Sequence, residues 1–494
     1  MKVKRRTGGV SFDAILLACI KLITTALGLA ITRLLSEYLS VYDYGTYSQV
    51  LLVTSTVASL TILGMMDGMN YFYCGESEVD KREAYVSTIF ALQCTVGTVA
   101  GGLVLLLSAP LCAYFDNPGV GPLLIFAAVL PLLQNLLGVL QILIVSTGKA
   151  KMLAIRNLII SIFRLIAVFI VVLAIRNIVV ILISSVVLDI GQIAFFWLIL
   201  RKNNCYIRLS KADIHLVGRI LRYCAPMAIF TMINSLNRDM DKYLISMVTD
   251  TETLALYTNA SKQLPFDIIM ASFCTVLIPY ITKYISENRK EKAADLYKLF
   301  LEIAYISTGI LCGAALSVAP QLMKLLYSNK YGDGLAIFCI YIFIDLFRFT
   351  NITLVLSAAG RTRRLMVLGT GSLLLNAVLN MIFYRAMGIR GPAIATLIVT
   401  LATGILILHF SAQVLGMHLL YLFNLKYLLI FTVESSALTI AMTLLQNLLA
   451  QLDVHYFAII VFVAGLYGVV MLMVNGKRLI SALKRVNSVE HDEM

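Results

Sequence analysis

Apolar runs of about 20 residues recur along the whole chain, and this pattern constrains the fold more than any other feature of the sequence. A run of that length crosses the roughly 30 Å hydrocarbon core of a bilayer as one α-helix. Fourteen such spans are predicted, at residues 11–36, 45–68, 85–107, 121–146, 153–175, 178–200, 223–248, 254–281, 299–319, 333–358, 365–385, 389–413, 425–449 and 455–475.

The composition agrees with a membrane protein that crosses the bilayer many times. Hydrophobic residues make up 60% of the chain and charged residues 14%, against about 45–50% and 25% in soluble domains. An outer-membrane barrel would show alternating segments of about 10 residues instead. The nine cysteines lie mostly inside apolar runs, so no disulfide framework is expected. The predicted fold class is therefore an all-α polytopic membrane protein with about 14 transmembrane helices.

Positive charges predict the orientation of the chain in the membrane. With the N-terminus in the cytoplasm, 28 of the 40 Lys and Arg residues fall in cytoplasmic segments and 5 in outside loops. Because cytoplasmic loops are enriched in Lys and Arg, both termini are expected in the cytoplasm of a multi-pass cell-membrane protein. The basic residues before the first span resemble a signal peptide, but no small-residue cleavage site follows, so an uncleaved first helix is expected.

A cytoplasmic linker is predicted at residues 201–222, the longest segment between spans. Ser210-Lys-Ala-Asp213 resembles a capping box, and Ile214, Val217 and Ile220 follow on one helical face. An amphipathic helix on the inner leaflet fits this pattern, and an ordinary connector remains the alternative.

Two short matches at nearly the same spacing indicate an internal duplication. Gly148 and Gly360 lie in similar segments with an offset of 212 residues, and Tyr47 and Tyr257 in others with an offset of 210. Helices 1–6 and 7–12 are thus predicted to be repeats related by an axis along the membrane normal. The expected parts are an N-terminal lobe at 1–200, the linker at 201–222, a C-terminal lobe at 223–413, two further helices at 414–476 and a cytoplasmic tail at 477–494.

Three motifs resemble those of polysaccharide transporters. They are Leu375–Ile382 followed by Gly388–Thr396, Asn237–Lys242 with Tyr257 downstream, and residues 33–48. The chain is similar, well over residues 1–413 and loosely beyond, to the Wzx-type flippase branch of the multidrug/oligosaccharidyl-lipid/polysaccharide (MOP) exporter superfamily. Pro392 departs from the small residue that the family more often has there. The resemblance implies two six-helix (MATE-like) lobes around a central cavity and export of undecaprenyl-diphosphate-linked oligosaccharide from the inner to the outer leaflet.

Charged residues inside spans are candidate site residues, because a charge at mid-bilayer costs at least about 2.5–3.5 kcal/mol. Lys21 and Arg164 lie near mid-span without an acid close by in sequence, which predicts an electropositive chamber in the N-terminal lobe. Arg forks match phosphate oxygens, so a diphosphate headgroup is the expected ligand. The predicted substrate-binding residues are Lys21, Arg164, Arg238, Lys262 and Arg348.

Some of these charges have a local alternative. Asp345 and Arg348, like Asp239 and Lys242, are three residues apart on one helix, so mutual neutralisation competes with a role in binding. Polar amides are also open to two interpretations. Asn376 and Asn380 suit hydrogen bonding between helices, with sugar-hydroxyl contact as the sharper alternative.

Ion coupling is expected to involve acids without partners, because no G-x-x-x-x-G-K-[ST] phosphate loop is present to use a nucleotide. The candidates are Asp189, Asp267 and Glu434. Asp267 is preferred because it follows Pro265 by two residues, and a broken helix exposes carbonyls that can bind a cation. The competing interpretation is an acid neutralised by Lys262 or a neighbouring helix.

The sequence indicates a transporter and not an enzyme. The five histidines show no paired metal spacing, and the outside loops are too short for a membrane polymerase or ligase. A multidrug/cation antiporter of the same superfamily is the main alternative, and a scaffold role stays open. No cofactor and no nucleic acid are expected. The expected partners are the lipid-linked oligosaccharide, membrane lipids, a polysaccharide polymerase and glycosyltransferases.

Overall fold

The computed structural model describes residues 10–76, 78–147, 150–202, 206–266 and 268–492. Most of these residues are helical, and no β-strand is present among them. The chain divides into two compact units, Met1–Ala255 and Leu256–Met494, and the division falls within α10 (Thr251–Ala260). Each unit is described separately below.

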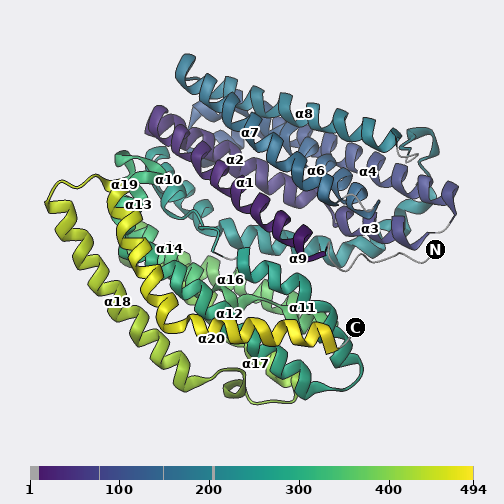
Figure 1. The fold of residues 1–494 in the computed structure, drawn as a ribbon. Helices are drawn as coiled ribbons and strands as arrows, with labels where there is room; N and C mark the ends of the chain where they lie inside the picture. The colour runs from purple at the N-terminus through teal and green to yellow at the C-terminus, as the bar shows by residue number, and fades with distance from the viewer. Residues whose placement is uncertain (1–9, 77, 148–149, 203–205, 267, 493–494) are drawn as a thin grey trace. The chain divides into compact units, whose positions relative to one another are not determined.

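The first unit is packed around α6, whose side chains are largely buried against α2, α3, α4 and α8 (Figure 1). Gly97 and Gly101 on α4 face α6, and a Cβ at Gly101 would lie 2.6 Å from the Ala128 carbonyl oxygen. Small residues at this G-x-x-x-G spacing allow the close helix packing that stabilises proteins in lipid. The helices are α1 (Val10–Tyr38), α2 (Val41–Thr61), α3 (Met65–Gly75), α4 (Val79–Leu106), α5 (Ser108–Phe115), η1 (Pro118–Leu123), α6 (Leu124–Ser146), α7 (Ala150–Ala174), α8 (Ile178–Lys202), η2 (Leu209–Lys211) and α9 (Ile214–Val248).

The second unit is packed around α12, which contacts α11, α14, α18 and α20 (Figure 1). Tyr297, Phe300 and Tyr305 of α12 are buried in its core. The helices are α11 (Ile268–Ser286), α12 (Lys290–Ser317), α13 (Ala319–Tyr327), η3 (Asn329–Gly334), α14 (Leu335–Phe347), η4 (Arg348–Asn351), α15 (Leu354–Ala358), α16 (Thr362–Met387), η5 (Gly388–Arg390), α17 (Gly391–Leu415), η6 (Leu419–Leu422), α18 (Leu425–Gln451), α19 (Tyr456–Ile459), the π-helical η7 (Ile460–Ala464) and α20 (Gly465–Asp492).

The predicted all-α polytopic fold is confirmed. Within the described residues, 11 helical segments are long and apolar enough to cross a membrane. One of them, Arg363–Leu415, contains both α16 and α17 and so accounts for two predicted spans. The predicted spans 11–36 and 254–281 correspond to α1 and to the broken pair α10 and α11. Each of the 14 predicted spans thus has a helical counterpart.

The order of four consecutive elements agrees with the predicted duplication. Four consecutive elements of the first unit begin 211 residues before four corresponding elements of the second unit. In the first unit these are α4, α5, η1 and α6, which begin at residues 79, 108, 118 and 124. In the second unit they are α12, α13, η3 and α14, which begin at residues 290, 319, 329 and 335. The offset agrees with the 210 and 212 of the sequence matches. A shared order of long helix, short helix, 3-10 turn and long helix is what two copies of one ancestral unit would keep.

The segment before α9 differs from the expected amphipathic helix. The predicted capping box at Ser210 is wrong: Ser210 lies in η2, and Asp213 caps α9, which runs without interruption to Val248. Lys211 forms ion pairs with Asp80 at 2.8 Å and with Glu83 at 2.9 Å. The hydrogen bonds from Lys211 to Asp80 and, secondarily, to Glu83 raise the pKa of Lys211. The same contacts connect this segment to α4. The domain bounds given above stay predictions.

The Gly388–Thr396 motif forms the turn between α16 and α17. Gly388 has φ +61°, a conformation that residues with a Cβ rarely adopt. Pro392 lies in the first turn of α17, where its missing N–H would have no helical partner in any case. The departure at Pro392 is therefore compatible with a regular helix.

Candidate functional site

The structure joins Arg164 and Asp189, two candidates that the sequence treated separately. A guanidinium nitrogen of Arg164, in the middle of α7, lies 3.1 Å from Asp189 Oδ1 on α8. The Asp189 side chain is 4% exposed, whereas that of Arg164 is 43% exposed. The expectation that Asp189 lacks a partner is wrong, because its partner, Arg164, comes from the neighbouring helix. The pair therefore consists of a partly exposed cation that is bound by a buried anion on the neighbouring helix.

The pair continues into a buried polar network along α7 and α8. Gln192 Nε2 donates to Asp189 Oδ1 at 3.0 Å, and Arg156 donates to the Gln192 side-chain oxygen. The Arg156 guanidinium also lies over the Phe196 ring, 4.5 Å from its centroid. Each buried polar group raises the cost of disrupting its neighbours. The network thus fixes the Asp189 carboxylate in front of Arg164.

Arg156 and Gln192 are the two members of this network that the sequence did not single out as candidates. Arg156 lies at the start of the predicted span 153–175, close to Lys149 and Lys151, so its charge was counted with the cytoplasmic ones, yet Arg156 is buried, with 6% exposure. The interhelical pair did leave a signal in the sequence. Arg164 and Asp189 lie almost equally far from Arg176 in the turn between α7 and α8, so an antiparallel hairpin brings them to one depth.

Lys21 lies on the exposed surface of α1, which packs along α7. No ion pair of Lys21 is present among the described residues. The Lys21 ammonium thus lacks a carboxylate partner in the described part of the chain, unlike Arg164, whose charge is matched by Asp189. No hydrogen bond joins the side chains of Lys21 and Arg164 among the described residues, so a shared chamber stays a prediction.

Helix α9 carries the predicted local pair. Lys242 Nζ lies 2.6 Å from Asp239 Oδ1, so this i,i+3 prediction is confirmed. Arg238 approaches Asp239 only to 4.0 Å, and its side chain is 58% exposed. Arg238 also donates to Ser235 Oγ at 3.3 Å. Of these cations, Arg238 is the more available to a ligand.

In the second unit, Asp345 forms the other predicted ion pair and also contacts the non-helical segment between α10 and α11. Arg348 lies 3.4 Å from Asp345 Oδ1, as the i,i+3 spacing predicted. Asp345 Oδ2 accepts a hydrogen bond from the Leu264 backbone N–H at 2.9 Å. Leu264 belongs to residues 261–266, which are not helical and separate α10 from α11. The break expected around Pro265 is thus present, and Asp345 stabilises it.

The remaining candidates have different surroundings. Lys262 is exposed in the same break and has an interaction partner. Asp267 lies outside the described residues. Glu434 on α18 is half-buried, and its Oε2 is buried without a hydrogen-bond partner among the described residues. A buried carboxylate oxygen of this kind keeps Glu434 among the candidates for binding a proton or cation.

The amides of α16 are divided between the two interpretations. Asn376 Oδ1 accepts from Thr396 Oγ1 on α17 at 3.5 Å, which is a contact between helices. Asn380 is buried, and neither of its amide atoms has a hydrogen-bond partner in the part of the chain that the structure describes. No cluster of three or more His, Cys, Asp or Glu that could hold a metal ion occurs within the described part of the chain.

Solved structures with a similar fold include two membrane transport proteins. The structure is similar to "Lipid II flippase MurJ, inward closed conformation", with a TM-score of 0.71 and 17% identity, covering 94% of this chain and 100% of that chain. It is also similar to an inward-facing "multidrug resistance MATE family transporter of the MOP superfamily", with a TM-score of 0.67 and 16% identity over 82% and 98% of the two chains. At these identities the likeness shows the fold alone.

A third structure is a MOP superfamily transporter from Pyrococcus furiosus, with a TM-score of 0.59 and 15% identity over 82% of this chain and 94% of that one. No curated protein sequence matches the chain significantly. The family described as "Polysaccharide biosynthesis protein" matches residues 31–335, more than half of the chain. This multi-pass membrane protein with the fold of the MOP transporters therefore belongs to the polysaccharide biosynthesis protein family.

Proposed function

We propose that the chain is a flippase that moves polyprenyl-diphosphate-linked oligosaccharide from the inner to the outer leaflet during surface polysaccharide biosynthesis. The observation that carries the proposal is the Arg164–Asp189 pair. Its guanidinium is 43% exposed inside a membrane-spanning helix, while its carboxylate is buried. The family match and the fold shared with a lipid II flippase support the same function.

The chemistry of the headgroup explains why Arg164 is suited to this role. A diphosphate carries its charge into a low-dielectric region, where a fixed cation stabilises it strongly. Arginine presents several N–H donors in a planar fork that matches phosphate oxygens, and the bond to Asp189 uses one side of that fork. Lys21, Arg238, Lys262 and Arg348 are the further proposed contacts of the substrate.

The energy source is proposed to be an ion gradient or the membrane potential. A potential of 100 mV acts on each moved charge with about 2.3 kcal/mol and, with the interior negative, favours export of an anion. Asp267 and Glu434 remain candidates for binding the coupling ion. Asp189 is the weaker candidate of the three, because Arg164 and Gln192 already bind its carboxylate.

The orientation proposed from the charges places both termini in the cytoplasm of the cell membrane. A polymerase would then take up the glycan outside, and glycosyltransferases would supply it inside. In a variant without native cysteines, a cysteine at position 116 should react with an impermeant thiol reagent from outside. A cysteine at position 289 should react only after permeabilisation, and the reverse pattern would refute this orientation.

The function is tested by reconstituting the full chain in proteoliposomes. A fluorescent polyprenyl-diphosphate oligosaccharide in the inner leaflet should become accessible to an external quencher faster than in protein-free vesicles. An imposed potential or a Na⁺ or pH gradient should change the rate. Uptake of a cationic dye driven by such a gradient, without movement of the glycolipid, would instead establish the antiporter alternative.

A further inference from the structure

A pair of exposed tyrosines lies where α3 packs against α9 in the first unit (Figure 1). The rings of Tyr71 on α3 and Tyr223 on α9 are stacked, with their centroids 4.1 Å apart and their planes 19° apart. Tyr71 is 52% exposed and Tyr223 is 39% exposed. Phe72 is buried and packs edge-to-face against both rings. The two tyrosines therefore form an aromatic surface that the core holds in place and that a ligand can reach.

Two polar side chains beside the tyrosines have unused hydrogen-bonding groups. Asp67, Asn70 and Tyr71 share one face of α3, because they are three or four residues after the first of them. Asp67 is exposed and interacts electrostatically with Tyr223, yet it forms no hydrogen bond or ion pair within the described residues. Asn70 Oδ1 accepts a hydrogen bond from Ser146 Oγ at 2.8 Å, whereas the amide N–H groups of Asn70 donate to no other described residue. The surface thus offers both an acceptor and donors.

The exposed surface continues along α9 into the membrane-spanning part of this helix. At spacings of three or four residues, Tyr223 is followed on one face by Met227, Phe230, Asn234 and Arg238. Asn234 and Arg238 are exposed, although α9 is long and apolar enough to cross a membrane. Polar residues in membrane spans mark substrate pathways, since few of them face lipid. From Tyr223 to Arg238 this face is about 22 Å long, at 1.5 Å per residue.

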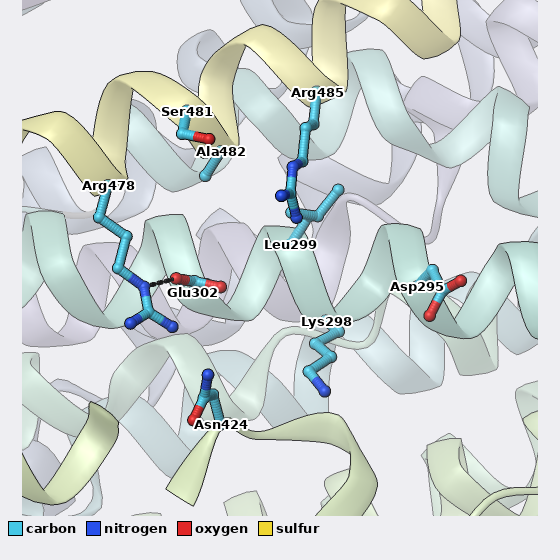
Figure 2. A pocket seen from close by; sticks show the side chains of 9 residues that line it. All are labelled: Asp295, Lys298, Leu299, Glu302, Asn424, Arg478, Ser481, Ala482 and Arg485. Atoms are coloured by element: carbon cyan, nitrogen blue, oxygen red, sulfur yellow. Dashed lines mark hydrogen bonds and ion pairs between the residues drawn. The ribbon is translucent and has the colours of Figure 1, made fainter. Parts of the chain in front are cut away.

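A cavity of about 660 Å³ in the second unit has a different character. Figure 2 shows Arg478 of α20 paired with Glu302 of α12 across this cavity. Asp295, another lining residue, accepts a hydrogen bond from the Tyr421 hydroxyl at 3.1 Å. Both acids of the cavity therefore have partners, and its lining is charged and lacks an aromatic ring among the described residues. The surface on α3 and α9 is the better match for an uncharged polar ligand.

We propose that the surface formed by Asp67, Asn70, Tyr71 and Tyr223 binds a sugar of the lipid-linked oligosaccharide. A sugar ring has an apolar C–H face that packs on an aromatic ring, and its hydroxyl groups need both donors and acceptors. The proposal rests on the flippase function and assigns the glycan to contacts other than those of the diphosphate. With the diphosphate at Arg238, the glycan extends along α9 toward the end that the proposed orientation places in the cytoplasm.

The test measures the affinity of the purified full-length chain for two probes by native mass spectrometry. One probe is polyprenyl-diphosphate oligosaccharide extracted from the native cells, and the other is polyprenyl diphosphate, which lacks the glycan. Tyr71→Ala/Tyr223→Ala should weaken binding of the oligosaccharide lipid roughly 10-fold and change binding of polyprenyl diphosphate less than about twofold. The matched control is Ile229→Ala, which removes an exposed apolar side chain from another face of α9 and should change neither affinity.

A second variant leaves the aromatic rings in place. Asp67→Asn should weaken binding of the oligosaccharide lipid roughly fivefold, because a charged acceptor is lost, at a melting midpoint equal to that of the parent protein. Asp116→Asn changes another exposed acid of the first unit and should have no effect on binding.

Three results would overturn the proposal in distinguishable ways. Parental affinity for the oligosaccharide lipid in both the tyrosine and the Asp67 variants would refute the sugar contact alone. Equal losses for the two probes would assign the surface to the structure of the transport path and not to the glycan. Failure of the parent protein to bind either probe would refute the flippase function and this inference with it.

Discussion

Each unit holds a buried aspartate against an arginine inside the membrane region, but the two pairs are built differently. In the first unit Arg164 and Asp189 come from two helices, and Asp189 otherwise meets only side-chain donors. In the second unit Asp345 pairs with Arg348, three residues away. Asp345 also accepts a hydrogen bond from the backbone N–H of Leu264, in the non-helical segment between α10 and α11. The same residue types thus serve two tasks. Asp345 maintains the fold, while Asp189 positions a cation.

The largest expected effect follows from removing Asp345. Asp345→Ala leaves the Leu264 N–H without its acceptor and Arg348 without its counter-ion, at a cost of about 3–5 kcal/mol. The amount of folded protein in the membrane fraction should fall sharply. Arg348→Gln serves as the comparison, because it removes the counter-ion but keeps the hydrogen bond from the Leu264 N–H to Asp345, so its cost should be smaller. If both variants were equally stable, Asp345 would not hold the break.

Arg164→Ala should have a smaller effect on stability, about 1–3 kcal/mol, because Gln192 still donates to the stranded carboxylate. Adding Asp189→Asn should restore the melting midpoint, since a neutral amide oxygen accepts the same bond from Gln192. A double-mutant cycle on melting midpoints of the purified protein measures this coupling. A double variant no more stable than Arg164→Ala would show that the pair is not the source of the loss.

Lys21→Ala should change stability least, within about 0.5 kcal/mol, because the side chain is exposed and has no ion pair in the described residues. The rate of glycolipid flipping should nonetheless fall roughly tenfold, the value of one charge-assisted hydrogen bond. Lys21→Arg should retain most of the rate. Loss of folded protein in Lys21→Ala would assign Lys21 a structural role instead.

Local features of the sequence predicted the fold well. The lengths of the apolar runs predicted the membrane spans. Two short motif matches predicted an internal repeat, and the first residues of corresponding helices, such as α4 and α12, are 211 residues apart. The i,i+3 pairs Asp239–Lys242 and Asp345–Arg348 were also predictable, because helix geometry alone brings such residues together. The break near Pro265 followed from the restricted backbone of proline.

Contacts that depend on register between distant segments were not predictable in the same way. Asp345 and Leu264 are 81 residues apart, and nothing in either local sequence points to the other. Arg156 seemed to belong to a basic loop because the apolar pattern does not fix the depth of a helix end.

The central claim is that Arg164 binds the headgroup during transport, and it is tested most directly by the rate of glycolipid flipping in Arg164→Ala/Asp189→Asn proteoliposomes, compared with Asp189→Asn alone. Both variants lack the buried charge, so they differ only in the guanidinium. We predict that the double variant flips the lipid-linked oligosaccharide roughly 10- to 100-fold more slowly than Asp189→Asn, at equal reconstitution and equal melting midpoint. Equal flipping rates would contradict the account and leave the Arg164–Asp189 pair as a structural contact between α7 and α8.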